Sequence, residues 1–585
     1  MKKIGIGYEN YKEFIDQDLY YVDKTLLVRD ILENGGKVTL LTRPRRFGKT
    51  LGLSMLRTFF EIEYDRNGNV IDKRRYFEGM KVMKCGDAVL CEMGKYPVIK
   101  LSLKGAKQKD FAGAFLALRR EINSEFSRHS YLANSEILTG EERRIAQEFM
   151  HGESSWMERA KLFKNPEERN KAIQDEYVKY AEALKLLSEL LEKYHGVSTV
   201  ILLDEYDVPL ENAWHEGFYE EMSGFIRSLF EAALKTNDAL AFAVITGCLR
   251  ISKESIFTGM NNLNIISIRS GRFSESFGFT EEETMWMIDE YGMADKSDEV
   301  RKWYDGYLFG KDEIYNPWSV TKYVYEHLPM PEAFPEPYWA NTSSNVILRE
   351  LVFKADEKVR EELDVLIGGG TIEKKIHEDI TYGDIYQSED NFWNFLFFTG
   401  YLKKVSERIE GEDIYVTMCI PNLEVRSLYR NQIKGWFDNV VKNADRRELY
   451  AAVIEKDEGK IGKILTGFLK RSISTFDSDE GFYHGYLLSM LIGMKDYTAR
   501  SNREEGDGRP DIVLYPENPS DPAYIFECKV RKKFNEMQGG LEEAFAQIGT
   551  KRYAEGILED GYAGVVSYGI CFCKKSCVVG LYEYK

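Results

Sequence analysis

The chain has 585 residues, enough for about three or four domains of roughly 150 residues each, and 43% of them are hydrophobic. Its net charge of −17 argues against a protein that coats nucleic acid through bulk charge, although a local basic patch can still bind it. The sequence has no apolar run of about 18 residues and no signal-peptide core at its N-terminus, so we predict a cytoplasmic protein without a membrane role.

The first predicted elements are a strand, a loop and a helix. The β-branched run GGKVTL precedes the loop LTRPRRFGKTL (41–51), and LSMLRTFFEI has helical spacing. This order is typical of a phosphate-binding loop, but the general pattern G-x-x-x-x-G-K-[ST] has glycine where Arg43 stands. In such a loop Gly48 lets the backbone approach phosphate, Lys49 reaches the β and γ phosphates, and the Thr50 hydroxyl binds Mg²⁺. The alternative for Lys49 is a solvated loop lysine.

Alternating strands and helices follow, interrupted by one long helical stretch. Residues 95–104 read as a strand, and residues 107–195 are mostly helical in pattern, which indicates an inserted helical arm. The run STVILLDEYD (198–207) is typical of a parallel strand buried on both faces, and ALAFAVITG (239–247) follows a further helix. The alternation predicts a doubly wound parallel sheet.

The acids that end the strand at 198–207 are the expected partners of the loop. Asp204 would hold Mg²⁺ through water, and Glu205 would polarise the attacking water. The alternative for both acids is that they cap the following helix. Neither half of the pattern is decisive alone, because Gly-Lys-Thr recurs by chance and acids often end strands. Together they predict a nucleotide site at one edge of the sheet.

Several motifs in order give the chain a resemblance to the AAA-ATPase-like proteins of bacteria from about residue 5 to 290. They are YVDKTLLVRDIL (21–32), LLTRPRRFGKTL, VILLDEYDVPL, ITGCLRISKESIFTGMNNL (245–263), FGFTEEE (277–283) and YNPWSV (315–320). The loop R-P-R-R-F-G-K-T resembles this family's own version, which implies that Arg43, Arg45 and Arg46 flank a polyphosphate or close over it. The resemblance implies ATP and Mg²⁺ as cofactors, with these cofactor-binding residues: Arg45, Arg46, Phe47, Gly48, Lys49, Thr50, Leu51, Asp204, Thr246 and Arg250.

Two of these residues lie at or just after the end of the predicted strand at 239–247. Thr246 ends that strand, where its hydroxyl could sense the γ-phosphate. Arg250 could reach the same phosphate from this chain or a neighbour, as an arginine finger does, so a homo-oligomer is possible. The alternative for Arg250 is a surface or capping arginine.

The middle of the chain is predicted to be mostly helical. Residues 391–430 suggest a helix, a two-stranded hairpin and a helix, which resembles a winged-helix unit. The alternative, which we favour, is that this unit packs the two ends of the chain together. From 435 to 480 the pattern is again helical.

From residue 481 the pattern changes to a compact α/β domain that holds two carboxylates and a lysine. Asp511 lies near the start of one strand, and Glu527 and Lys529 lie on the next. Because side chains alternate along a strand, Glu527 and Lys529 share a face while Cys528 points away. If the two strands form a hairpin, the three polar side chains converge. Two carboxylates suit Mg²⁺, and the lysine can orient or deprotonate a water.

This domain, over about residues 480–585, resembles the PD-(D/E)XK nuclease superfamily. The matching motif is Pro510-Asp511 followed by Glu527-Cys528-Lys529, and Gln547 with Tyr553 resembles the Q-x-x-x-x-x-Y signature of several branches. The resemblance implies Asp511 and Glu527 as metal ligands, a catalytic set completed by Lys529 and Gln547, and nucleic acid, with DNA favoured, as the substrate. The alternative is a structural ion pair between Glu527 and Lys529 across a partly exposed sheet.

Other polar residues near this motif have weaker claims. Glu504 could add a ligand but reads better as a turn acid, and His484 reads better as a packed or hydrogen-bonded residue than a functional one. A local excess of basic residues could track a nucleic-acid backbone or form a solvated face. These residues are Lys529, Arg531, Lys532, Lys533, Lys551, Arg552, Lys574 and Lys575.

The eight cysteines are sparse for this length, which favours reduced thiols. Cys571, Cys573 and Cys577 form C-x-C-x₃-C, but a zinc site usually has two such pairs. The alternating pattern around them favours small core residues on strands.

The sequence therefore predicts an α/β protein with three parts. Residues 1–280 form a P-loop NTPase-like domain with the insertion at about 107–195, residues 281–480 form a helical, winged-helix-like linker region, and residues 481–585 form the PD-(D/E)XK restriction-endonuclease-like domain. The predicted function is ATP binding, with ATP hydrolysis favoured, coupled to a Mg²⁺-dependent nuclease. The alternatives are a nucleotide-dependent switch whose C-terminal domain binds a partner without cleaving it, and an interaction protein with both sites vestigial.

Overall fold

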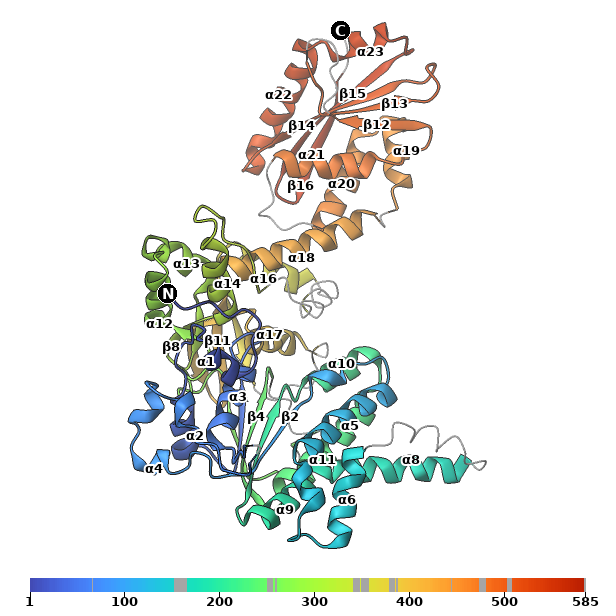
Figure 1. The fold of residues 1–585 in the computed structure, drawn as a ribbon. Helices are drawn as coiled ribbons and strands as arrows, with labels where there is room; N and C mark the ends of the chain where they lie inside the picture. The colour runs from blue at the N-terminus through green and yellow to red at the C-terminus, as the bar shows by residue number, and fades with distance from the viewer. Residues whose placement is uncertain are drawn as a thin grey trace. The chain divides into compact units, whose positions relative to one another are not determined.

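A computed structural model of the chain describes most of its residues. The described ranges are 1–65, 67–151, 166–249, 256–257, 260–339, 348, 357–377, 385, 388–442, 445–472, 480–501 and 508–582. The chain divides into two compact units (Figure 1). The first comprises Met1–Thr342 and Thr371–Ser427, and the second comprises Ser343–Gly370 and Leu428–Lys585. The division into three domains at residues 280 and 480 stays a prediction.

The first unit is built on a five-stranded parallel sheet in the order β2-β3-β4-β1-β5. Its strands are β1 (Val38–Thr42), β2 (Val98–Ser102), β3 (Thr199–Asp204), β4 (Leu240–Gly247) and β5 (Leu263–Ile266). Every residue of β1 and β3 is buried, as expected of parallel strands covered on both faces. The predicted α/β fold with a parallel sheet is confirmed, and β5 is a strand that the sequence analysis missed.

The helix after β1 is α3 (Lys49–Phe60), which contacts β2 and β3. Its apolar side chains apart from Leu51, including Leu53, Leu56 and Phe60, are fully buried, so the helix is fixed against the sheet. The stretch predicted to be a helical insertion is indeed helical. Its helices are α5 (Phe111–Arg128), α6 (Gly140–His151), α8 (Pro166–Ala181) and α9 (Ala183–His195).

The remaining helices and strands of this unit surround the sheet or follow it in the chain. The helices are α1 (Tyr11–Asp16), α2 (Leu27–Asn34), α4 (Asp87–Leu90), α10 (Val208–Glu216), α11 (Tyr219–Phe230), α12 (Glu281–Glu290), α13 (Ser297–Tyr304), α14 (Pro317–His327) and α17 (Glu389–Phe398). The strands form two small antiparallel sheets: β6 (Phe279–Thr280), β7 (Tyr307–Phe309) and β8 (Asp312–Tyr315), then β9 (Ile372–Ile376), β10 (Lys403–Glu410) and β11 (Asp413–Cys419).

The predicted helix, hairpin and helix over 391–430 are present as α17, β10, β11 and α18 (Leu423–Lys442). The third strand of this sheet, β9, was not predicted. The turn before the hairpin packs against the phosphate-binding loop: Gly400 has φ +89°, and a Cβ there would lie 2.9 Å from Pro44. This close approach leaves no room for a side chain, so the hairpin is part of the support of that loop.

The second unit is a mixed sheet in the order β12-β13-β14-β15-β16, in which only β14 and β15 run parallel. Its strands are β12 (Tyr497–Ser501), β13 (Ile512–Pro516), β14 (Ala523–Val530), β15 (Val565–Cys573) and β16 (Ser576–Tyr582). Its helices are α16 (Glu357–Ile367), α19 (Arg447–Glu455), α20 (Glu458–Ser472), α21 (Glu480–Leu491), α22 (Met537–Thr550) and α23 (Tyr553–Glu559).

Two apolar clusters cover the two faces of this sheet. On one face Phe526 and Cys528 pack with residues of α19, α20 and α21, and on the other Val513 and Ile525 pack with α22 and α23. The stretch 537–559 forms two helices, α22 and α23, and not one, because Arg552 adopts a left-handed conformation with φ +53° between them. The short strand β12 was not predicted.

Two further sequence predictions concern cysteines and membranes. Cys571 and Cys573 are fully buried on β15, and Cys577 lies in the larger cluster, so the prediction of core cysteines is confirmed. Within the described ranges, no helix is both long and apolar enough to cross a membrane.

Candidate functional sites

The phosphate-binding loop joins the end of β1 to the start of α3. Gly48 is exposed and has φ +84°, a backbone conformation that strains any residue with a side chain. The helix begins at the next residue, so its first N–H groups and positive end face the loop. This is the backbone arrangement that the Gly-Lys-Thr sequence predicts for an anion site.

Lys49 is folded back onto its own loop. Its ammonium donates hydrogen bonds to the carbonyl oxygens of Arg43, at 2.8 Å, and Pro44, at 2.9 Å, and the side chain is nearly buried. The Sγ atom of Cys248 lies 3.7 Å from the same nitrogen. The lysine is therefore not a solvated loop residue, and a phosphate that bound to it would replace carbonyl oxygens as acceptors.

Asp204 lies at the centre of the site, at the carboxyl end of β3. One carboxylate oxygen accepts a hydrogen bond from the Thr50 hydroxyl at 2.7 Å, and the other accepts one from the Thr246 hydroxyl at 2.6 Å. Asp204 is 1% exposed, and its two partners come from α3 and from β4, which lies between β1 and β3 in the sheet. The parallel register thus brings together three residues that the sequence separates by up to 196 positions (Thr50 to Thr246).

Glu205 follows Asp204 directly, in a left-handed conformation with φ +53°. Burial and the neighbouring Asp204 raise the pKa of its carboxyl group. Asp207, which sequence reasoning missed, accepts hydrogen bonds from the backbone N–H groups of Cys248, at 2.7 Å, and Leu249, at 3.1 Å. It therefore fixes the segment that follows Thr246.

The arginines of the loop have three different environments. Arg43 is fully buried and donates to the carbonyl oxygens of Thr42 (2.8 Å), Ile266 (3.2 Å) and Phe273 (2.9 Å). Burial lowers the pKa of its guanidinium to about 9. The expectation that Arg43 flanks a polyphosphate is therefore wrong, because its side chain ties the loop to β5 from within the core.

The other loop residues differ in exposure: Arg45 and Arg46 lie nearer the surface, and Phe47 is buried. Arg45 forms an ion pair with Glu211 of α10, and the guanidinium carbon of Arg46 lies 4.2 Å from the centre of the Trp318 ring. Phe47 is buried against Tyr307 and Phe309, which makes it an anchor of the loop. Leu51 is half-buried in the first turn of α3, and Arg250 lies outside the described residues.

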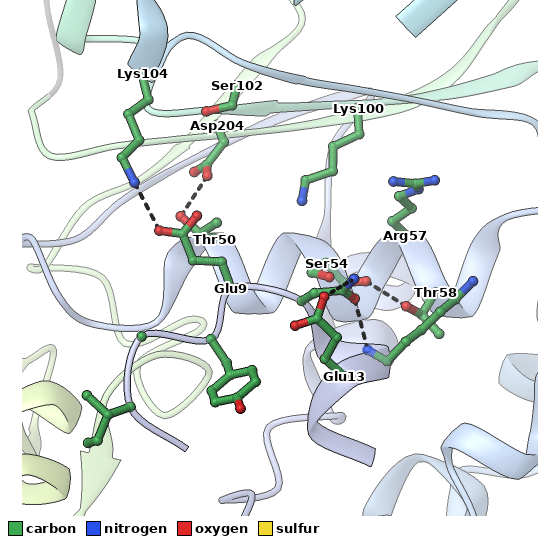
Figure 2. Close-up of a pocket in the computed structure, with 15 residues that line it drawn as sticks. Glu9, Glu13, Thr50, Ser54, Arg57, Thr58, Lys100, Ser102, Lys104 and Asp204 are labelled. Carbon is green, nitrogen blue, oxygen red and sulfur yellow. Dashed lines mark hydrogen bonds and ion pairs between the residues drawn. The ribbon is translucent and has the colours of Figure 1, made fainter. Parts of the chain in front are cut away.

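A cavity of about 650 Å³ opens beside Thr50 and Asp204 (Figure 2). Its walls are the N-terminal segment, the exposed side of α3 and the end of β2. The residues lining it include Lys100 and Glu9, neither of which any sequence motif indicated.

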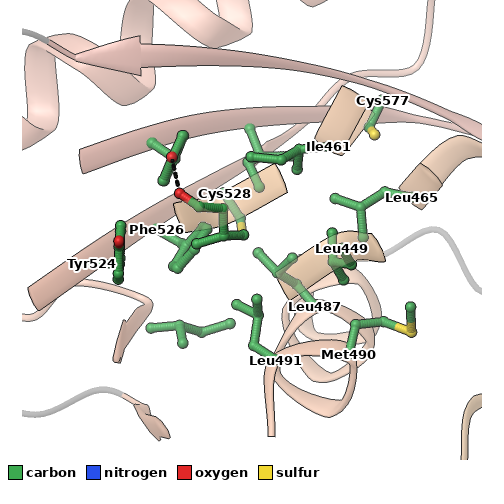
Figure 3. Close-up of a cluster of buried hydrophobic side chains, with 14 of the residues drawn as sticks. Leu449, Ile461, Leu465, Leu487, Met490, Leu491, Tyr524, Phe526, Cys528 and Cys577 are labelled. Carbon is green, nitrogen blue, oxygen red and sulfur yellow. Dashed lines mark hydrogen bonds between the residues drawn. The ribbon is translucent and has the colours of Figure 1, made fainter. Parts of the chain in front are cut away.

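The second site lies in the second unit, on the face of β14 opposite Cys528. Asp511 immediately precedes β13, and its carboxylate accepts a hydrogen bond from the Cys528 N–H at 2.7 Å. The predicted hairpin is present, since Ile512 pairs with Phe526 in antiparallel register. Cys528 itself points into the apolar cluster with Tyr524 and Phe526 (Figure 3). The predicted alternation along β14 is confirmed.

Lys529 links the acids to the following helix. Its ammonium donates to Glu527 at 3.1 Å and to the side-chain oxygen of Gln547 at 2.8 Å. The Gln547 amide in turn donates to the Tyr553 hydroxyl at 3.1 Å. Glu527, Lys529, Gln547 and Tyr553, all indicated by short motifs, thus form one connected hydrogen-bond network.

Glu527 has an environment that suits a metal ligand. It is 1% exposed, and one of its carboxylate oxygens has no hydrogen-bond partner in the described part of the chain. Burial and the nearby Asp511 raise its pKa to about 7, against the opposing effect of Lys529. A buried carboxylate oxygen without a donor is unfavourable, and a divalent cation would supply the missing partner.

Residues near this site have mainly structural contacts. The Nε2 atom of His484 lies 2.9 Å from the Asp511 carbonyl oxygen and 3.1 Å from the Ser501 hydroxyl, so this histidine is hydrogen-bonded as the plainer interpretation predicted. Of the basic residues, Arg531 pairs with Glu543, Arg552 with Glu555, and Lys575 with Asp364. Glu504 lies outside the described residues. Among the described residues no group of three or more histidines, cysteines or acids forms a metal cage.

Comparisons with known proteins agree with the two resemblances. Residues 5–257 match the family model described as predicted AAA-ATPase, and residues 478–581 match that of the PD-(D/E)XK nuclease superfamily. A protein of Azotobacter chroococcum mcd 1, described as "Uncharacterized protein in vnfD 5'region", is 27% identical over 555 residues, which cover 90% of this chain and 89% of its own. No solved structure matches the chain. The chain thus contains an AAA-ATPase-like domain and a PD-(D/E)XK nuclease superfamily domain.

Proposed function

We propose that this chain binds and hydrolyses ATP in its first unit and cleaves nucleic-acid phosphodiesters in its second, each with Mg²⁺. The observation that carries the nuclease proposal is the convergence of Asp511, Glu527 and Lys529, with an unpartnered oxygen on Glu527. The hydroxyls of Thr50 and Thr246, which both donate to Asp204, support the nucleotide proposal because they join the loop to the acid at the end of β3.

At the first site the chain's own residues would divide the work of binding and hydrolysis. Lys49 exchanges its two carbonyl acceptors for phosphate oxygens, while the N–H groups at the start of α3 hold the same phosphates. Thr50 and Asp204 would hold Mg²⁺, the Thr246 hydroxyl keeps the Asp204 carboxylate oriented, and Glu205 would position the attacking water.

At the second site Asp511 and Glu527 would hold Mg²⁺ with water and substrate phosphate, since that ion commonly takes only one or two protein carboxylates. The bound ion would stabilise charge on the scissile phosphate. Lys529, once its ammonium has lost a proton to solvent, would take the proton of a water that it orients, and the side-chain oxygen of Gln547 fixes the direction of the Lys529 side chain. DNA is the favoured substrate.

A nuclease assay tests this proposal on single- and double-stranded DNA and RNA. It compares the wild-type chain with Lys529→Ala and Lys49→Ala, in Mg²⁺ or Mn²⁺ and with or without ATP, with exposed Lys495→Ala as the matched control. We expect cleavage by the wild type, the Lys495→Ala control and Lys49→Ala, and none by Lys529→Ala. Loss of cleavage in Lys49→Ala as well would show that the nuclease depends on ATP. Cleavage that survives Lys529→Ala would refute the assigned site.

A second candidate function is a nucleotide switch whose C-terminal unit binds nucleic acid without cutting it. The bonds from Lys49 to its own loop favour it, because nucleotide binding would have to rearrange that loop. Tight ATP binding with no cleavage of any substrate in the same assay would support this alternative.

A further inference from the structure

The cavity beside Thr50 and Asp204 is a compartment separate from the phosphate-binding loop. Its volume of about 650 Å³ is typical of small-molecule sites, and none of the residues 43–49 lines it. It is lined by Ile6, Gly7, Tyr8, Glu9, Asn10, Lys12, Glu13, Thr50, Ser54, Arg57, Thr58, Lys100, Ser102, Lys104 and Asp204. A molecule bound here would lie next to the Thr50–Asp204 pair but outside the polyphosphate cradle.

Lys100 and Ser102 stand on one face of β2, since they are two residues apart, and both extend into the cavity (Figure 2). Lys100 differs from the other cations of the lining. Lys12 pairs with Glu63, Arg57 with Glu61, and Lys104 with Glu9.

Within the described chain, the Lys100 ammonium forms no ion pair or side-chain hydrogen bond, and the Ser102 hydroxyl is likewise without a partner. Burial lowers the pKa of Lys100, and the charges of Asp204, Glu125 and Glu9 only partly oppose this effect. A half-buried ammonium without an ion-pair partner is unfavourable, and an anion bound beside Lys100 would supply that partner. A tetrahedral anion can accept bonds from both side chains at once and lies within the field of Arg57 and Lys104.

We propose that this cavity binds a phosphate dianion, either free or carried by a small molecule, with Lys100 and Ser102 as its main ligands. The volume leaves room for an organic group beyond the phosphate, and Tyr8, Asn10 and Glu13 on the opposite wall offer an aromatic ring and polar groups to it. The site does not require that the loop bind nucleotide, so it goes beyond the proposed function.

Calorimetric titration of the full chain tests this proposal with two probes, orthophosphate and ribose 5-phosphate. Because a phosphate-binding loop also takes free phosphate, the loop is first saturated with a non-hydrolysable ATP analogue and Mg²⁺. If the analogue does not bind, the proposed nucleotide function has failed separately. The same titrations are then made without nucleotide on a Lys49→Ala chain, in which the loop is impaired.

We expect Lys100→Met to weaken phosphate binding by about tenfold, the effect of losing one hydrogen bond to a charged group, and Ser102→Ala by about threefold. The exposed Lys84→Met is the matched control and leaves binding unchanged. Lys100→Met should melt at the same temperature as the wild type or higher, because it removes an unpaired charge. Tighter binding of ribose 5-phosphate than of orthophosphate would identify a carried phosphate, and the reverse would identify the free ion.

Three results would overturn the proposal. The first is that neither probe binds the wild type, and the second is that Lys100→Met binds both probes as well as the wild type does. The third is that Lys100→Met weakens the ATP analogue as much as the phosphate, which would make the cavity part of the nucleotide site.

Discussion

The two candidate sites use the same residue types, but they differ in whether every buried carboxylate oxygen of the key acid has a hydrogen-bond donor. In the first unit both oxygens of Asp204 accept hydroxyl hydrogen bonds, and Lys49 donates to two carbonyl oxygens. In the second unit Glu527 keeps a buried oxygen without a donor in the described chain, beside a second carboxylate. Asp204 and Lys49 are thus satisfied by their own neighbours and must exchange partners to bind a ligand, whereas Glu527 has a buried oxygen that a bound cation would satisfy.

The largest expected effect is at the second site. Lys529→Ala removes the group assigned to the water and should lower the rate of cleavage by about 10³-fold, within the range for general acid–base catalysis. The rate is measured on the substrate that the wild type cleaves best. Lys529→Arg separates charge from chemistry: if it restores full activity, Lys529 supplies only charge and the assigned proton transfer is wrong.

The next effect separates a structural arginine from a surface one in the first unit. Arg43→Met leaves three buried carbonyl oxygens without their donor, so we expect it to lower the free energy of unfolding by about 3 kcal/mol. Arg46→Met is the matched control, because its exposed guanidinium only stacks on Trp318, and it should cost less than ~1 kcal/mol. Chemical denaturation measures both values, and equal losses would contradict the assignment of Arg43 to the core.

The pH dependence of metal affinity sharpens the contrast. Because the Glu527 pKa is raised to about 7, this carboxyl group is protonated at lower pH, and a metal ion must then displace its proton. We expect the affinity for Mn²⁺ to fall about tenfold per pH unit below 7 and to level off above it. Calorimetry at several pH values measures this slope, and a flat profile between pH 5.5 and 7 would contradict it.

The same raised pKa has a consequence for the stability of the metal-free chain. A carboxyl group whose pKa is raised by folding contributes its full stability at pH values below its ordinary pKa. That contribution is lost as the pH rises through the pKa of the folded state. The free energy of unfolding should therefore decrease by on the order of 2 kcal/mol between about pH 4.5 and 7 on account of Glu527. Glu527→Gln should remove that part of the decrease in denaturation curves, and an unchanged profile would be evidence against the raised pKa.

The smallest effect concerns the support of Asp204. Thr246→Val removes one hydroxyl donor from a buried carboxylate and should weaken ATP binding with Mg²⁺ by about tenfold, with the free energy of unfolding lowered by ~1–2 kcal/mol. Thr236→Val, at an exposed hydroxyl between α11 and β4, is the control. An ATP affinity equal to that of the wild type would mean that Thr246 has no part in the site.

The sequence predicted those strands and turns that depend on residues close together in the chain. The apolar runs of β3 and β4 and the alternation around Cys528 were enough to place strands, and Gly48 placed the turn into α3. The predicted pairing of the two C-terminal strands then brought Asp511 to Glu527. Short elements such as β5, β9 and β12 were missed because their sequences are too brief or too polar to stand out.

The features that could not be predicted depend on contacts between distant residues. Arg43 reads as a basic loop residue until Ile266 and Phe273 are seen to surround it. Lys100 is one of many lysines in the sequence, and only the fold of the N-terminal segment over α3 encloses it in a cavity. The partner that Glu527 lacks is equally invisible in a motif, because burial is a property of the whole sheet.

The most direct test of this contrast is to count bound Mn²⁺ ions by electron paramagnetic resonance, first without nucleotide and then with a non-hydrolysable ATP analogue. Without nucleotide we predict one bound ion, which is lost in Glu527→Gln and kept in Asp204→Asn. On adding the analogue we predict a second ion, which is lost in Asp204→Asn and kept in Glu527→Gln. Binding of the first ion that is unaffected by Glu527→Gln would contradict the account, as would the absence of any ion until nucleotide is present.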